Sequence, residues 1–249
     1  FSQMSLDRQK NVINNFKNKD ERLLIKKYFK NFEDSYFNKH SSESLIWQSE
    51  LIIKNKKNKL IVGCRRKFDD LIEIFIKVDD SPGLFYKSVK ILEHSGLEII
   101  DANIFSSENN KLAANTFITK YSRQDRILNK SELTELCSKI EKNFNKEDGI
   151  SKMKSLKKKN TRFEKNIKIN ESINFDKKRN LITIETVDSS GLLANIAKVF
   201  LKNKVSIYSA RINTLGERVE DTFEIENSNQ KLVPSYKIKK IISELKKVV

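Results

Sequence analysis

The feature that most constrains this chain is an internal repeat. The stretch VDDSPGLFYKSVKILEHSGLEIIDANI begins at Val78, the stretch TVDSSGLLANIAKVFLKNKVSIYSARI begins at Thr186, and a shift of 108 positions aligns them without a gap. The shift pairs Asp, Ser, Gly and Leu of the first stretch with the same residue types in the second. A later match of Thr116 and Phe117 to Thr222 and Phe223 needs a two-residue slip. Self-similarity on this scale indicates duplication of one folding unit.

Each copy carries the same succession of hydrophobic periods. Alternating apolar residues predict a strand before each turn, and a helical stripe predicts a helix after it. A further strand, a hairpin and a second helix follow in each copy. We therefore predict an α+β chain with two ferredoxin-like βαββαβ domains, each an antiparallel sheet with helices on one face.

The last strand of each domain is the least certain part of this assignment. The stretch NIKINESINF (166–175) is predicted to complete the first domain. The second copy ends with its last helix, so its fourth strand is missing or comes from elsewhere. The stretch KLIVGCRR (59–66) could fill that edge.

The first part of the chain is predicted to be helical. Its apolar periodicity indicates helices, and Ser41 or Ser42 is suited to cap one of them. We place the helical segment at 1–57, the first duplicated domain at 58–176 and the second at 177–249. Because the sequence opens at Phe1 and not at a methionine, we expect it to be part of a longer protein.

The composition argues against several classes of partner. The formal net charge is +16, but the excess is mostly lysine spread through every segment, whereas nucleic-acid modules concentrate arginine and aromatics on one element. The basic stretches 54–59 and 154–162 are predicted to be solvated linkers that serve as hinges. With two cysteines, no signal-peptide pattern and no membrane-length apolar run, we expect reduced thiols, a cytoplasmic location and no membrane partner.

The duplicated turn between strand and helix has the chemistry of a small-molecule site. Glycine allows close backbone approach, and the helix amino terminus favours a carboxylate. Asp80 and Asp188 would suit an ammonium group, so each turn matches the two ends of a free amino acid. The alternative is that both aspartates simply cap helices.

The next strand of each copy offers further polar side chains at equivalent positions. Asp101 and Asn103 share one face of the first, and Ser209 and Arg211 share one face of the second. These side chains could line the edge of the same pocket or stand on an exposed sheet face. Periodicity alone leaves both interpretations open.

These motifs resemble a known family. DDSPGLFYKSVKILEHSGLEIIDANIFS, NTFIT and SARINTLGERVEDTF are similar to the tandem ACT domains of bifunctional uridylyltransferase and uridylyl-removing enzymes, over about 32–249. The resemblance implies a parent that uses UTP and Mg²⁺ or another divalent metal, and that modifies the PII signalling protein. It also implies an ACT pair that senses glutamine or another small amino acid and that associates within the chain or in a dimer.

Carried over to this sequence, the resemblance assigns ligand-binding positions at both turns. To them we add Asn103 and Arg211 from the neighbouring strands. The predicted ligand-binding residues are Asp80, Pro82, Gly83, Leu84, Asn103, Asp188, Gly191, Leu192 and Arg211. Two departures from the family stand out: Ser189 and Ser190 replace an Arg-Pro pair, and Asn115 replaces the aspartate that the second copy keeps as Asp221.

We predict no catalytic residue, metal ligand or cofactor in this chain. Neither His40 nor His94 is followed by aspartate, and no glycine-rich turn lies near paired aspartates, so both histidines are expected to be structural. The resulting hypothesis is a regulatory fragment. Alternatives are an independent ACT regulator of another enzyme or of transcription, a pair of domains that only docks PII, and a nucleic-acid-binding protein.

Overall fold

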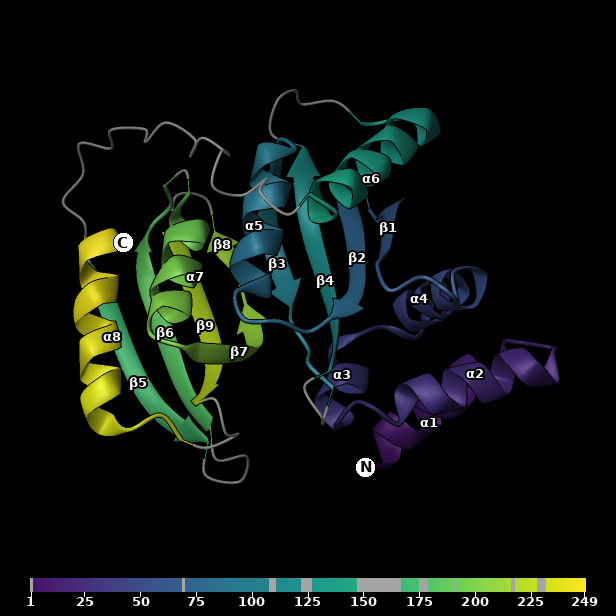
Figure 1. The fold of residues 1–249 in the computed structure, drawn as a ribbon, viewed down its shortest axis with the longest axis horizontal. Helices are drawn as coiled ribbons and strands as arrows, with labels where there is room; N and C mark the ends of the chain where they lie inside the picture. The colour runs from purple at the N-terminus through teal and green to yellow at the C-terminus, as the bar shows by residue number, and fades with distance from the viewer. Residues whose placement is uncertain are drawn as a thin grey trace. The chain divides into compact units, whose positions relative to one another are not determined.

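The structure is a computed structural model that describes residues 2–68, 70–107, 111–121, 127–146, 167–174, 179–189, 191–215, 218–227 and 232–249. The chain divides into two compact units, and Figure 1 labels the helices and strands that make them up. The first unit comprises residues 1–63, 75–80 and 105–115. The second comprises residues 64–74, 81–104 and 116–249.

The predicted amino-terminal helices are present in the first unit. They are α1 (Gln3–Asn14), α2 (Lys19–Phe29), α3 (Asp34–Lys39) and α4 (Ser42–Lys54). Ser2, Asn18 and Ser41 cap α1, α2 and α4, because each side chain accepts a backbone N–H from the first turn. Ser41 is therefore the cap, and residues 56–59 of the predicted basic linker after α4 are exposed.

An aromatic cluster forms the core of this unit. Phe32 stacks on Tyr36 with ring centroids 4.4 Å apart, and Phe105 meets Tyr36 edge-on at 5.3 Å. The Tyr36 hydroxyl donates to Gln48 Oε1 at 2.6 Å, which satisfies a polar group that is otherwise buried among rings. Burial raises the pKa of the Tyr36 phenol above its usual value. Phe75 also joins this core and lies 6.4 Å from Trp47 of α4.

The first sheet has the order β1-β2-β4-β3. Its strands are β1 (Ile61–Arg66), β2 (Leu71–Asp79), β3 (Leu97–Asn103) and β4 (Leu112–Tyr121). Helix α5 (Leu84–His94) follows β2, and α6 (Lys130–Phe144) follows β4 and contacts α5. A capping box starts α6, where Asn129 and Glu132 exchange hydrogen bonds.

The second sheet repeats this order as β5-β6-β9-β7, with the short β8 (Thr214–Leu215) paired to β9. Its long strands are β5 (Lys168–Asn174), β6 (Arg179–Val187), β7 (Val205–Arg211) and β9 (Arg218–Asn227). Helices α7 (Leu192–Lys202) and α8 (Ser235–Val248) contact each other on one face of the sheet (Figure 1). The predicted α+β class is confirmed, and both sheets are consistent with ferredoxin-like ACT domains.

The prediction for the last strands is wrong. The stretch assigned to the end of the first domain is β5, which pairs antiparallel with β6 in the second sheet, from Lys168 opposite Glu185 to Asn174 opposite Arg179. The stretch at 59–66 is β1, which lies at the edge of the first sheet beside β2. Only four residues separate β5 from β6, so an antiparallel neighbour is the nearest partner available.

The element order of each copy is therefore ββαββα. The fourth strand of each sheet precedes the other three in the sequence, whereas in the predicted order βαββαβ it would follow them. The second sheet does not lack its fourth strand. The domain boundaries at residues 57 and 176 stay predictions, and the predicted linker at 154–162 lies outside the described residues.

The two sheets share a local irregularity that supports duplication. The register of β3 against β4 shifts between Ile99 and Asp101, and that of β7 against β9 shifts between Ile207 and Ser209. The shifts occupy equivalent positions of the repeat. A bulge bends its strand in a defined way and acts as a built-in feature of a fold.

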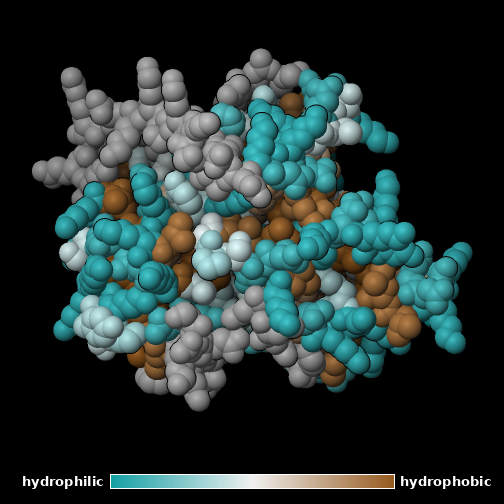
Figure 2. Space-filling view, viewed as in Figure 1, coloured by the Kyte–Doolittle hydropathy of each residue, from teal (hydrophilic) through white to brown (hydrophobic). Residues whose placement is uncertain are grey.

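Figure 2 shows hydrophilic residues over much of the described part of the face in view, with smaller hydrophobic areas between them. Along β6, burial alternates through Ile182, Ile184 and Thr186, as expected for a sheet with one covered face. No helix among the described residues is long and apolar enough to cross a membrane.

Candidate functional site: two duplicated turns

The turns before α5 and α7 have the same backbone geometry. Gly83 and Gly191 occupy the N-cap positions with φ of 81° and 79°. Leu84 donates its N–H to the Ser81 carbonyl at 3.1 Å, and Leu192 donates to the Ser189 carbonyl at 2.9 Å. Only glycine adopts this left-handed conformation at low cost, so both turns require it.

Neither aspartate is the N-cap residue that the alternative interpretation suggested, because the glycines hold those positions. The Asp80 carboxylate accepts a hydrogen bond from Ser106 Oγ at 2.6 Å, and its backbone N–H donates to the Lys111 carbonyl at 3.0 Å. The Asp188 carboxylate accepts the N–H of Ser189, but burial dominates and raises its pKa. Asp80 therefore stabilises the segment that contains Ser106 and Lys111, whereas the Asp188 carboxylate is partly desolvated.

The space around the two glycines differs. A methyl group placed at Gly83 would lie 3.0 Å from Cδ1 of Leu201, in α7. At Gly191, no atom of the described residues lies within 4 Å of the same point, apart from its chain neighbours. The first turn is therefore closed by an apolar side chain at this point, and the second is open.

Two further carboxylates influence the second turn. Burial, together with the charge of Asp188, raises the pKa of Asp221 to about 7. Burial also raises the pKa of Glu93 to about 7, with Lys90 opposing the shift and Asp188 adding to it. The charge of Asp188 thus acts on both Glu93 and Asp221, so this region has a negative potential that a cation would relieve.

The position of Asp221 follows from strand register. It pairs with Ile184 across β6 and β9, and directly opposed residues point to the same face, so Asp221 lies on the covered face. Thr186 shares that face of β6, two residues along. Its hydroxyl is buried, and it has no hydrogen-bond partner among the residues that the structure describes.

The repeat alignment explains why the turns differ. Glu93 and Leu201 occupy equivalent positions, 108 residues apart. Leu201 lies against Gly83 of the first turn, and Glu93 interacts with Asp188 of the second. One exchange of leucine for glutamate thus makes one turn apolar and the other acidic. The sequence prediction did not include Glu93, although this mismatch within the repeat could have revealed it.

Asn115 and Asp221 form a second exchanged pair. Asn115 Oδ1 accepts the N–H of Phe105 at 3.4 Å, and Asp221 Oδ1 accepts the N–H of Asn213 at 3.2 Å. Both side chains therefore hold the segment that follows the bulged strand, in equivalent places. An uncharged asparagine is enough to accept this backbone N–H in the first copy. The negative charge of Asp221 is therefore not required for the hydrogen bond in the second copy.

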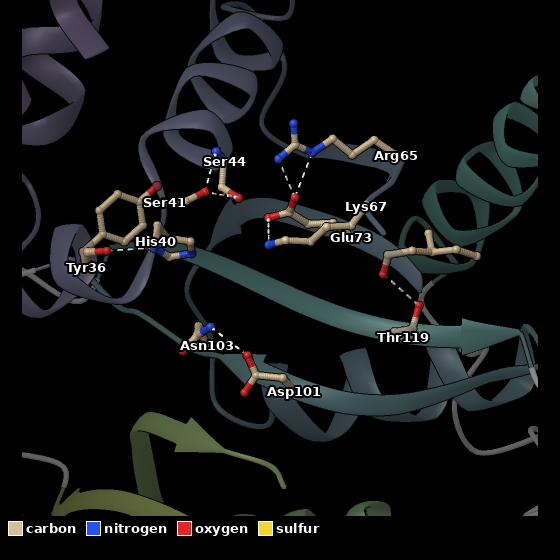
Figure 3. Close-up of polar contacts among 11 residues, drawn as sticks. Tyr36, His40, Ser41, Ser44, Arg65, Lys67, Glu73, Asp101, Asn103 and Thr119 are labelled. Carbon is tan, nitrogen blue, oxygen red and sulfur yellow. Dashed lines mark hydrogen bonds and ion pairs between the residues drawn. The ribbon is translucent and has the colours of Figure 1, made fainter. Parts of the chain in front are cut away.

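Asn103 and Arg211 face away from the covered side of their sheets. Each follows an alanine, Ala102 or Ala210, that is fully buried on the opposite face. Asn103 Nδ2 donates to Asp101 Oδ2 at 3.2 Å (Figure 3), and Arg211 is exposed. The structure thus separates Arg211 from Asp221 by the thickness of the sheet.

The remaining predicted residues lie in the turns or at the starts of the helices that follow them. Pro82 is exposed in the first turn, and Leu84 and Leu192 are buried at the starts of their helices. Ser190, one of the two departures from the family, lies outside the described residues.

Comparison with curated proteins gives a consistent set of relatives, and no protein-family model matches the chain. A bifunctional uridylyltransferase/uridylyl-removing enzyme of Acinetobacter baumannii (strain AYE) is 27% identical over 242 residues, covering 94% of this chain and 27% of the relative. The enzyme of that name from Psychrobacter arcticus is 25% identical over 248 residues, with 94% and 27% covered. The one from Acinetobacter baylyi is 27% identical over 207 residues, with 80% and 23% covered.

The chain is homologous to a fragment of this enzyme. It spans about a quarter of the length of the curated relatives it matches.

The described residues of this chain hold no group of three or more His, Cys, Asp or Glu that could bind a metal ion. Buried His40 hydrogen-bonds through Nδ1 to the Tyr36 carbonyl at 2.7 Å (Figure 3), which is a local structural contact. His94 is exposed in the last turn of α5.

Proposed function

We propose that this chain is a regulatory, glutamine-sensing part of a cytoplasmic enzyme that uridylylates and deuridylylates the PII signalling protein. The single observation that carries the proposal is that nearly the whole chain aligns with a fragment of enzymes named for these two activities. UTP and the divalent metal belong to the parent enzyme in this proposal, and so does the contact with PII.

The second turn is the better candidate for the amino-acid site. Asp188, Asp221 and Glu93 provide negative potential for an α-ammonium group, and the space beside Gly191 is open. The amino terminus of α7 offers the partial positive charge that favours the α-carboxylate. The buried Thr186 hydroxyl supplies a further polar group near Asp221.

Regulation would follow from differential affinity. A ligand shifts an equilibrium only if it binds one arrangement of the protein more tightly than another. Contacts of α5 with α7, and of β3 with β7, bring the two duplicated domains together within the second unit. Ligand bound beside Asp188 would act on these contacts through Glu93 of α5.

Titration calorimetry of the chain with L-glutamine tests this proposal. We expect Asp188→Asn to weaken binding by about 10- to 100-fold, the usual cost of removing a hydrogen bond to a charged group. Asp80→Asn is the matched control and should change the affinity less than about threefold, because that carboxylate holds Ser106. Gly191→Val should abolish the heat, whereas Gly83→Val should leave binding at the second turn measurable.

Two outcomes would refute the proposal at different levels. Absence of heat with every amino acid tested would remove the sensor function. Binding that survives both glycine substitutions would place the site away from the turns. Uridylylation assays on the parent enzyme, with and without glutamine, would then test the link to PII separately.

A further inference from the structure

The two cysteines of the chain lie together in the second unit. Cys64 is in β1 and Cys137 is in α6, 73 positions later in the sequence. A side-chain hydrogen bond joins the two thiols. Such a bond places the sulfur atoms in contact, although the proposed regulatory function uses neither residue.

The surrounding packing supports this contact independently. Arg66 is two residues from Cys64 on β1, and its Nη2 donates to the Leu128 carbonyl at 2.7 Å, just before α6. Leu133 is four residues from Cys137, on the same face of the helix, and lines one small pocket together with Arg66 and Leu128. The carboxyl end of β1 therefore lies beside the start of α6, two residues from Cys64 and four residues from Cys137 along their own elements.

The two thiols differ in character. Hydrogen bonding from Cys64 lowers the pKa of the Cys137 thiol, against the opposing effects of burial and of Glu141. The same hydrogen bond and burial raise the pKa of Cys64. Both residues are partly exposed. Thiolate character and exposure together determine which cysteine reacts first.

We propose that Cys64 and Cys137 are a redox modification site that forms a reversible intramolecular disulfide when hydrogen peroxide oxidises the chain. The Cys137 thiolate attacks one peroxide oxygen, an S–O bond forms, the O–O bond breaks, and the leaving hydroxide takes up a proton to become water. The Cys64 sulfur then attacks the Cys137 sulfenic acid. The S–S bond forms, the S–O bond breaks, and the second water leaves with the Cys64 proton. Two thiols thus give two electrons to one peroxide.

The disulfide would link the edge strand of the first sheet to a helix on that sheet. A covalent link between residues far apart in sequence restricts the unfolded chain more than the folded one. The oxidised protein should therefore unfold at a higher urea concentration than the reduced protein.

Treatment of the chain with hydrogen peroxide tests the proposal. We expect the thiols accessible in denaturant to fall from two to zero, the mass to fall by two hydrogens, and the product to remain monomeric. Dithiothreitol should restore both thiols. An intermolecular disulfide, or sulfinic acid without an S–S bond, would overturn the proposal.

Two matched variants separate the roles of the cysteines. Cys137→Ser should consume peroxide about tenfold more slowly than the unmodified chain. Cys64→Ser should react at a similar rate but accumulate a sulfenic acid that dimedone traps. Urea unfolding of the reduced variants checks that both are folded. Equal loss of reactivity in the two variants, or no trapped sulfenic acid in folded Cys64→Ser, would contradict the assigned order of reaction.

Discussion

The two duplicated turns have the same backbone and different surroundings. Gly83 and Gly191 have φ values within 2° of each other, at 81° and 79°, and each precedes a helix of the same length. Leu201 lies against the first turn, whereas the space beside the second is open. The two copies therefore share the glycine that the backbone of the turn requires, but they differ in the side chains around it.

The difference comes from two exchanges within the repeat. At one position Leu201 replaces the equivalent Glu93, and at the other Asp221 replaces Asn115. Both acidic members of these pairs influence the second turn, where Asp188 adds to the pKa increase of each. A partly desolvated carboxylate is costly for folding, and such groups are often found at functional sites.

The largest expected effect comes from removing the extra charge of the second copy. A carboxyl pKa that rises from 3.8 to about 7 corresponds to a cost on the order of 4 kcal/mol for the ionised form. The folded state then binds more protons than the unfolded state between about pH 4 and pH 7, so the free energy of unfolding falls as pH rises through that range. Asp221→Asn should raise it by about 2–4 kcal/mol at pH 8 and change it little at pH 4.

Urea unfolding across this pH range measures the effect. Asn115→Asp is the reciprocal control and should introduce the same pH dependence into the first copy, because Asn115 is fully buried. If Asp221→Asn is neutral or destabilising at pH 8, the Asp221 charge is compensated in the folded protein and the comparison of the turns fails.

The next effect concerns the space beside the glycines. Gly191→Ala should cost about 1–2 kcal/mol, since alanine disfavours a left-handed φ. Gly83→Ala should cost about 1 kcal/mol more, because its methyl group would also press on Leu201.

Combining Gly83→Ala with Leu201→Ala gives a double-mutant cycle for this contact. We expect the additional cost of Gly83→Ala to disappear in the Leu201→Ala background, as measured by urea unfolding. Equal costs for both glycine substitutions in the unmodified background would show that the first turn is no more closed than the second.

The smallest effect is expected at the first aspartate. Ser106→Ala removes the hydroxyl that donates to the Asp80 carboxylate at 2.6 Å and should lower the free energy of unfolding by about 1 kcal/mol. Ser106→Thr keeps the hydroxyl and serves as the control. If glutamine affinity falls in Ser106→Ala by more than about threefold, the first turn takes part in binding and the contrast between the turns is weaker than we infer.

Much of the fold could be predicted from local pattern. Alternating and helical periods located the strands and helices of both copies, and the conserved spacing of Gly83 and Gly191 located both turns, because each depends on a few neighbouring residues. The Ser41 cap was predictable for the same reason. The assignment of β5 to the first sheet was wrong because hydrophobic periodicity predicts that a segment is a strand but not which strand it pairs with.

The sequence by itself determined that one folding unit occurs twice and that each copy places a glycine at the turn before a helix. Only the tertiary structure decided that a preceding strand completes each sheet, that Leu201 lies against Gly83, and that Asp188 acts on both Glu93 and Asp221. The physical reason is the distance along the sequence over which each feature is determined. Backbone conformation is set by adjacent residues, whereas the potential and the free space at a turn depend on side chains that the fold brings from distant parts of the chain.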